Sequence, residues 1–247
     1  MNDASHLFRF IPERHGDVRL VPGIDLDAFA ASNHVTLGLH EITDAAADYP
    51  LVFMKDNNNG QFRLTALFGL SPGINAYLDG DFWQAVYLPH EVLTAPFRIA
   101  GSDQALCINE ASALVTTDTG DALFDHDGNE APALLRIRNM LAKLEQGRAH
   151  ADELIAALLP LGLLRPVSVA VHRQSGPSEL VQGLYSVSPL QLKAAAPDLL
   201  LGLHTRGFLG PIYTIIQSMA QFNRIRQLHN LRSEDQIASF DLVMEQG

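Results

Sequence analysis

The stretch that decides the fold spans residues 49–97 and reads YPLVFMKDNNNGQFRLTALFGLSPGINAYLDGDFWQAVYLPHEVLTAPF. Short apolar runs alternate here with clusters of Asn, Asp, Gly and Pro, at residues 56–60, 71–73 and 79–81. Aromatic and β-branched residues favour strands, and the intervening residues favour tight turns. The pattern is therefore typical of an antiparallel meander, and we expect it to continue through residues 97–99 and 105–108.

The segments before this stretch predict an arm, a strand and a helix. Residues 1–30 carry several prolines and glycines without a regular apolar period, which predicts an irregular N-terminal arm. Residues 33–41 alternate well enough for a first strand. Thr43 can cap a short helix over residues 44–48, which must end before Pro50 because proline restricts the residue that precedes it.

Helical patterns dominate after Pro132. A helix is predicted from Pro132 to Gly147, and a second over residues 151–159. Residues 167–171 and 180–187 then read as a late β-hairpin, and Ser188-Pro189 opens a helix over residues 190–196. Another short helix is expected over residues 198–204. The longest helix is expected to start at Pro211, on an apolar stripe of helical spacing, made of Ile212, Ile215, Ile216, Met219, Phe222 and Ile225.

These elements predict an α+β fold, with an antiparallel sheet mainly from the N-terminal half, covered by C-terminal helices and one late hairpin. Residues 31–232 are expected to form one domain. Residues 233–247 are expected to be a polar tail that frays.

Composition excludes several classes of protein. The net charge of −11 argues against a nucleic-acid partner, which would require a basic surface. With Cys107 as the one cysteine, neither an internal disulfide nor a cysteine-rich zinc site can form. Residues 1–19 lack the apolar segment of a secretory signal, and no apolar run is long enough to span a bilayer. We therefore expect a soluble cytoplasmic protein.

The motifs of hydrolases are incomplete. Gly69-Leu70-Ser71-Pro72-Gly73 matches the spacing of a nucleophile elbow, but an elbow requires a helix after the serine, and Pro72-Gly73 favours a turn instead. The same segment lacks the third glycine of a dinucleotide fingerprint. Residues 125–130 resemble a calcium loop without supplying its alternating ligands, so they are interpreted as a turn.

Histidines beside carboxylates are the candidates for a metal site. His40-Glu41 and His90-Glu91 begin like the zinc motif H-E-x-x-H, but no second histidine follows one turn later. The H-x-D pairs at His15 and His150 are about as frequent as chance allows. The metal candidates are therefore residues that only the fold could bring together, namely His40, Glu41, His90 and His204. The sequence identifies no cofactor.

Aromatic residues in the meander could instead line a pocket for an organic ligand. Residues of this kind on strands are more often part of the core. If a pocket exists, the groups expected at its mouth are Asn75, Trp83, Tyr87 and Arg98.

Several blocks agree in order, spacing and residue type with one bacterial family. They are Glu41; Asp48-Tyr49-Pro50-Leu51-Val52-Phe53; Leu67-Phe68-Gly69-Leu70 with Gly73 and Asn75; Trp83, Tyr87 and Pro89 before Pro96-Phe97; Gly120-Asp121-Ala122-Leu123-Phe124-Asp125-His126-Asp127-Gly128; Gly162-Leu163-Leu164 with Pro166; Gly183-Leu184-Tyr185; and Leu203-His204, Gly207, Leu209 and Ser218. On these blocks the chain, from about Glu41 to about Arg226, resembles the SapC family. One departure is that Leu93-Thr94-Ala95 stand where the family usually has two arginines and a tyrosine, which puts any role of that basic pair in doubt here.

The resemblance implies no particular biochemical activity. It does imply an accessory role beside a modifying enzyme. With no complete catalytic motif in the sequence, the leading hypothesis is a non-catalytic protein that binds a small molecule, a peptide or a protein partner. The first alternative is a metal-dependent oxygenase or hydrolase acting on a peptide or natural product. The second is a component of a surface layer or secretion system, which the family name suggests and the expected lack of a signal peptide disfavours.

Overall fold

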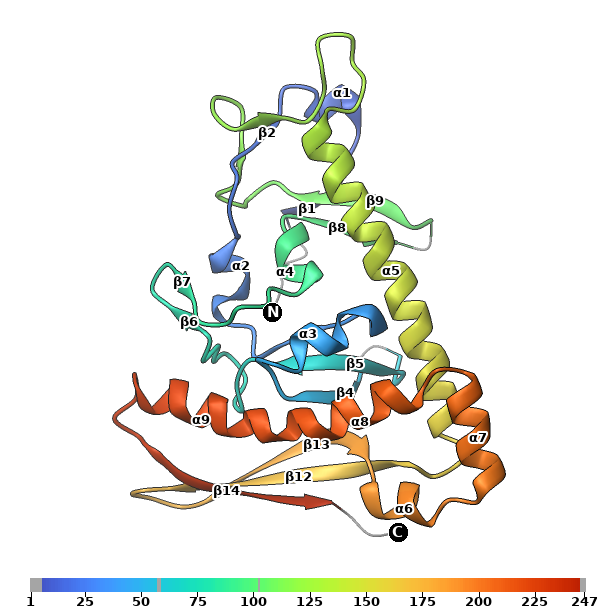
Figure 1. Ribbon diagram of the computed structural model, residues 1–247. Helices are drawn as coiled ribbons and strands as arrows, with labels where there is room; N and C mark the ends of the chain where they lie inside the picture. The colour runs from blue at the N-terminus through green and yellow to red at the C-terminus, as the bar shows by residue number, and fades with distance from the viewer. Residues whose placement is uncertain (1–5, 57–58, 102, 245–247) are drawn as a thin grey trace.

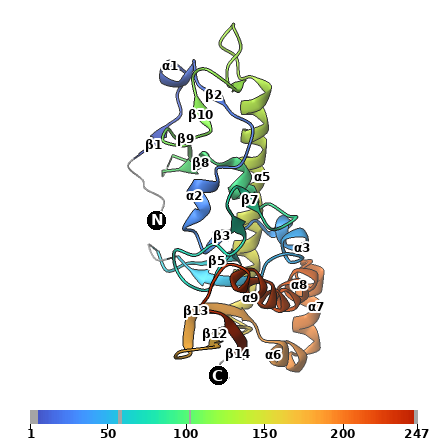
Figure 2. The ribbon, with the colours of Figure 1, turned by 90° about the vertical axis from the view of Figure 1, so that its left-hand side faces the viewer.

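The computed structural model describes residues 6–56, 59–101 and 103–244. The ends of the expected arm and tail, residues 1–5 and 245–247, lie outside this description, as do residues 57–58 of the polar break and Ser102. The molecule is elongated, with a large sheet at one end, small sheets at the other, and the long helix α5 running beside both (Figures 1 and 2).

The large sheet is antiparallel and contains six strands in the described residues. Its spatial order is β14 (Ile237–Met244), β12 (Leu164–Arg173), β13 (Glu179–Val187), β4 (Leu51–Lys55), β5 (Phe62–Leu67) and β3 (His34–Thr36). The predicted late hairpin is present as β12 and β13. The first turn of the meander is present as well, because β4 pairs with β5 across the polar break.

Later parts of the meander are less regular than the sequence predicts. The strand expected over residues 33–41 is limited to β3, and the helix expected after it is α3 (Ile42–Ala45). The apolar run around Trp83 forms only the two-residue strands β6 (Leu78–Asp79) and β7 (Phe82–Trp83). Aromatic residues of the meander are nevertheless part of the core, as the fully buried side chains of Tyr49 and Tyr77 show.

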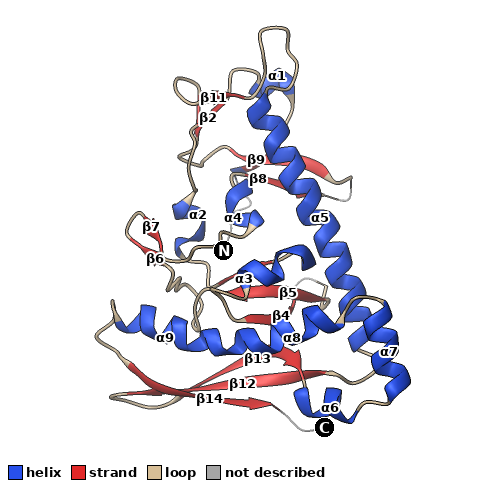
Figure 3. Ribbon diagram, viewed as in Figure 1, coloured by secondary structure: helices blue, strands red, loops and turns tan. Residues whose placement is uncertain are grey.

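Helices α8 (Leu209–Ser218) and α9 (Phe222–Asn230) lie across the large sheet (Figure 3). The predicted apolar stripe is confirmed here, but a 3₁₀ turn, η3 (Met219–Gln221), separates the two helices. Preceding them are α6 (Pro189–Ala194), with Ser188 as its N-cap, and α7 (Pro197–Thr205). Of the predicted stripe, four residues are buried and two are partly buried, and Leu228 extends the buried face: the buried ones are Ile212, Ile215, Phe222 and Ile225, and the partly buried ones are Ile216 and Met219.

Helix α5 (Pro132–Leu158) is one helix of 27 residues, so the predicted break at Gly147 is wrong. Gly147 does not end the helix, and instead lies where another segment of the chain contacts it. A Cβ atom on Gly147 would lie 2.2 Å from Nδ1 of His40 and 2.9 Å from the Cα of Gly38. Gly147 therefore lets the segment around η2 (Leu39–Glu41) approach the helix backbone.

A second, smaller core lies around the N-terminal half of α5. Strands β1 (Leu7–Arg9), β9 (Ala105–Asn109) and β8 (Phe97–Ala100) form one sheet, and β10 (Val115–Thr116), β2 (Arg19–Leu20) and β11 (Asp121–Ala122) another. The N-terminal arm is therefore not irregular throughout. It adds β1 and β2 to these sheets and includes the short helices α1 (Pro12–His15) and α2 (Leu26–Ala30). The buried residues of this core include Phe10, Phe97, Ile108, Leu134, Ile137 and Leu141.

Residues 237–244 were expected to fray and instead form the edge strand β14, paired with β12. As an edge strand, β14 buries few of its side chains: Ile237 is buried, whereas the apolar Leu242 and Val243 are exposed.

The predicted α+β class is confirmed. Within the described residues, no individual helix has both the length and the apolar character needed to cross a membrane. One helix pair, Pro197–Thr205 with Leu209–Asn230, meets that test of length and composition jointly, with a bend of 96° between its halves.

Candidate functional site

Residues of both cores line a cleft between α2, α4 (His90–Thr94), β3 and β8. The cleft has an inner hollow of about 130 Å³ and an outer hollow of about 540 Å³. The two hollows are continuous because they share lining residues, which are Asp25, Ala28, Phe29, Glu91 and Asn109.

Two arginines line the inner hollow. Arg148 of α5 binds Glu145 through Nη1 at 2.7 Å, and its Nη2 contacts Glu91 and Thr36. Its Nε is buried and has no hydrogen-bond partner in the described part of the chain. The side chain of Arg98, in β8, makes no hydrogen bond or ion pair to any residue that the structure describes. The spare N–H donors of the inner hollow are therefore those of Arg98.

The outer hollow is more acidic. Asp25, Asp27 and Glu91 line it together with His34. Asp25 is occupied in part, since its Oδ1 accepts the backbone N–H of Ala28 and caps α2. Burial lowers the pKa of His34, and the charge of Glu91 opposes this only in part.

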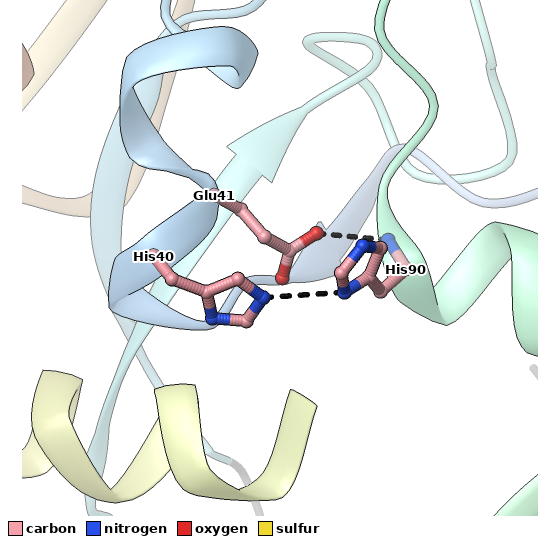
Figure 4. Close-up of side chains that lie close together, drawn as sticks. All are labelled: His40, Glu41 and His90. Atoms are coloured by element: carbon pink, nitrogen blue, oxygen red, sulfur yellow. Dashed lines mark hydrogen bonds between the residues drawn. The ribbon is translucent and has the colours of Figure 1, made fainter. Parts of the chain in front are cut away.

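A separate group of side chains converges beside the cleft: His40 and Glu41 from η2, and His90 from the start of α4 (Figure 4). One ligand atom from each of them can be chosen such that all three lie within 4.8 Å of one another. Nε2 of His40 is 3.2 Å from Nδ1 of His90. Burial lowers the pKa of His40, and this effect outweighs the opposing charge of Glu41.

Glu41 is held in place by three donors. Its Oε1 accepts the backbone N–H of His90 at 2.8 Å and the hydroxyl of Tyr87 at 2.9 Å. Its Oε2 accepts the backbone N–H of Gly38 at 2.7 Å. Burial and the adjacent Glu41 carboxylate raise the pKa of Tyr87, so this tyrosine stays a hydrogen-bond donor at neutral pH.

The segment that carries Tyr87 and His90 is anchored by a hydrogen-bond network. The Asp48 carboxylate accepts the backbone N–H groups of Val86 and Tyr87, at 3.0 and 2.8 Å. The hydroxyl of Tyr49 donates to the carbonyl of Tyr87 and accepts the indole N–H of Trp83. Residues that carry the family resemblance therefore fix the backbone on which His90 stands.

The structure separates the four residues expected at the mouth of a pocket. Arg98 lines the inner hollow, whereas Asn75 is buried and bonds the carbonyl of Phe29 and the N–H of Tyr77. Trp83 and Tyr87 belong to the anchoring network. Their contacts are structural, and the prediction that they bind a ligand is untested.

Of the four metal candidates, His40, Glu41 and His90 come together, and His204 does not. His204 is exposed in α7 and lies outside the group.

Sequence reasoning missed Arg148 and Glu91 as residues of the cleft. Arg148 is one of several arginines on a helix, and no local spacing distinguishes it from them. Glu91 was considered only as half of an incomplete zinc motif. A weak signal was present in Thr94 and Ala95, which depart from the family pattern and line the same inner hollow as the two arginines.

Comparison with known proteins agrees with the resemblance. No curated protein and no solved structure matches the chain. The model of the SapC family matches residues 12–225 of the 247. The chain therefore belongs to the SapC family.

Proposed function

We propose that this protein is a non-catalytic binding protein for a small molecule or peptide that carries a carboxylate group, which docks in the inner hollow of the cleft. The observation that carries the proposal is the surplus of donors there. The side chain of Arg98 lines the hollow and has no hydrogen-bond or ion-pair partner among the described residues, whereas the terminal nitrogens of Arg148 are already bound to Glu145, Glu91 and Thr36. A guanidinium frequently binds a carboxylate through two parallel hydrogen bonds, and Arg98 has its N–H donors available for such a ligand.

Charge favours a carboxylate over a phosphate. Guanidinium groups bind both, frequently with two parallel hydrogen bonds. Glu91 and Asp25 also line the inner hollow, and they repel a dianion more strongly than a single negative charge.

The size of the inner hollow and the charges around it support an amino acid or the end of a peptide as the ligand. The inner hollow of about 130 Å³ is close to the cavity of roughly 150 Å³ that holds a benzene molecule in another protein. The remainder of the ligand would extend into the outer hollow, where Asp27 and Glu91 favour a cationic amine. Binding without turnover is consistent with an accessory role in which the ligand is presented to a modifying enzyme.

The test is thermal unfolding in the presence of the twenty free amino acids, their C-terminal amides, and a set of short peptides. A ligand at one hundred times its Kd stabilises by about 2.7 kcal/mol, which raises Tm by roughly 5–10 °C for a chain of this length. We expect at least one free acid to give such a rise and its amide to give little.

Arg98→Gln should abolish the rise, because it removes the unpartnered cation. Arg136→Gln is the matched control, since Arg136 is exposed on α5 and pairs with Asp121 away from the cleft. A wild-type protein that responds to no carboxylate, or an Arg98→Gln variant that responds as the wild type does, would overturn the proposal. A rise with inorganic phosphate alone would also contradict it.

A metal-dependent oxygenase or hydrolase is the second candidate, because His40, Glu41 and His90 converge at a separate site.

A further inference from the structure

We propose that His40, Glu41 and His90 form a binding site for a divalent first-row transition-metal ion, with Zn²⁺ as the reference ion. The site goes beyond ligand binding in the cleft and does not depend on it. Two imidazoles and one carboxylate suit zinc, iron, nickel and copper better than calcium or magnesium, which prefer oxygen ligands alone.

The spacing of the two histidines is the first argument. Zinc binds imidazole nitrogen at about 2.0–2.1 Å, so two such ligands on a tetrahedral ion are about 3.3 Å apart. Nε2 of His40 and Nδ1 of His90 are already 3.2 Å apart. A metal between them replaces the proton that they now share, and the remaining protons then sit on Nδ1 of His40 and Nε2 of His90.

Glu41 gives the second argument. This residue is only 1% exposed, yet its carboxylate makes no ion pair with any residue that the structure describes. Buried carboxylates are normally paired with a cation or coordinate a metal, because an uncompensated buried charge is costly. The carboxylate points toward the two imidazole rings (Figure 4), and a bound metal would supply the missing positive charge.

The ligands are also supported from behind, as residues of metal sites usually are. Oε1 of Glu41 is occupied by Tyr87 and His90, while Oε2 accepts only the N–H of Gly38 and keeps a lone pair for a metal. The ring of His40 rests against the backbone of α5 at Gly147. The ligand atoms lie up to 4.8 Å apart, whereas ligands of one tetrahedral zinc ion are about 3.3 Å apart. For a direct Glu41–metal bond, the carboxylate must therefore move up to about 1.5 Å closer to the imidazole nitrogens.

Two histidines and one carboxylate leave at least one position open on a tetrahedral ion. His40 is exposed and His90 half-buried, so solvent can reach that position.

The test is titration of the full-length, untagged, chelator-treated protein with Zn²⁺ by calorimetry, with Co²⁺ absorption as a second readout. We expect one ion per chain, and a visible Co²⁺ spectrum characteristic of four or five ligands. His40→Ala and His90→Ala should each weaken Zn²⁺ binding at least 100-fold, because each removes a ligand while leaving the backbone N–H of His90 in place.

His204→Ala is the matched control, because His204 is an exposed histidine outside the group and its removal should leave the Kd unchanged. Circular dichroism checks that each variant is folded. X-ray absorption of the wild-type zinc complex should show two imidazole ligands, which tests the site without any substitution.

Weak or absent Zn²⁺ binding in the wild type would overturn the site, and so would binding that survives the loss of both His40 and His90. Arg98→Gln should bind Zn²⁺ normally even where it loses the cleft ligand. His90→Ala should retain that ligand, so the two proposals can fail separately.

Discussion

Substitution of Gly147 by alanine tests how closely α5 and the η2 segment are packed. An alanine Cβ would lie 2.2 Å from Nδ1 of His40 and 2.9 Å from the Cα of Gly38, whereas such atoms in contact are usually about 3.5–4.0 Å apart. The His40 ring can rotate away, but the Gly38 backbone can move only if η2 shifts with it.

Two opposing effects set the magnitude of this change. Alanine in a helix interior is favoured over glycine by about 1 kcal/mol. Overpacking costs about 1–3 kcal/mol and more where backbone must move. Because the alanine Cβ meets two atoms too closely, we place the overpacking cost of Gly147→Ala toward the upper end of that range. The free energy of unfolding should therefore fall by about 1–2 kcal/mol, which lowers Tm by roughly 2–8 °C.

The assay is thermal and urea unfolding of Gly147→Ala beside Gly202→Ala. Gly202 is also inside a helix, but a Cβ there meets nothing within 4 Å. Gly202→Ala should therefore gain about 0.5–1 kcal/mol from helix propensity alone. A Gly147→Ala variant as stable as Gly202→Ala would refute the close packing of η2 on α5, and with it the position assigned to His40.

Three further predictions concern polar side chains. Tyr87→Phe removes one of the three donors to Glu41, so it should cost about 1.5–3 kcal/mol in unfolding free energy and weaken Zn²⁺ binding roughly 10-fold; an unchanged Zn²⁺ Kd would show that Tyr87 does not position Glu41. Burial raises the pKa of Tyr49, Tyr77 and Tyr87, so each keeps its proton in the folded state after the unfolded chain has lost it. Stability should then fall above pH about 10, by about 1.4 kcal/mol per pH unit for each of the three, and their tyrosinate absorbance should appear only with unfolding; early, reversible appearance in the native state would contradict this. Desolvation raises the pKa of Glu110, but the hydrogen bonds from Arg14 and His15 outweigh it and leave that pKa below its ordinary value. The resulting stabilisation is present above pH about 4.5 and is lost as pH falls through the folded pKa, so Glu110→Gln should be less stable than the wild type at pH 7 and equal to it in strong acid. An equal difference at both pH values would rule out the ionic contribution.

Local sequence signals were sufficient for the elements that depend on local chemistry. The polar break before Phe62 predicts the β4–β5 turn, and Ser188-Pro189 predicts the start of α6, because turn and cap residues act on their own backbone. The apolar period of α8 and α9 likewise identifies their buried face.

Tertiary contacts account for the errors. The sequence predicts a helix end at Gly147, yet α5 continues through it, and the absence of a side chain there lets η2 touch the helix. Strand β14 forms because it pairs with β12 at the edge of the sheet, a contact that no local pattern encodes.

For the candidate sites, the sequence could indicate which types of residue to consider, but not which of them lie close together. His40 and His90 are 50 positions apart, and neither completes a metal motif within its own segment. Arg98 was named as a pocket residue, but its proximity to Arg148 depends on how β8 packs beside α5. Chemistry assembled from separate elements becomes visible only once the chain is folded.

The measurement that tests the central claim most directly is calorimetric titration of the wild-type protein with the most stabilising free acid and with its C-terminal amide. The account predicts one binding site and an amide Kd weaker by roughly 30- to 150-fold, the effect of losing about 2–3 kcal/mol of hydrogen bonding to charged groups. Equal affinity for acid and amide would contradict a carboxylate held by Arg98.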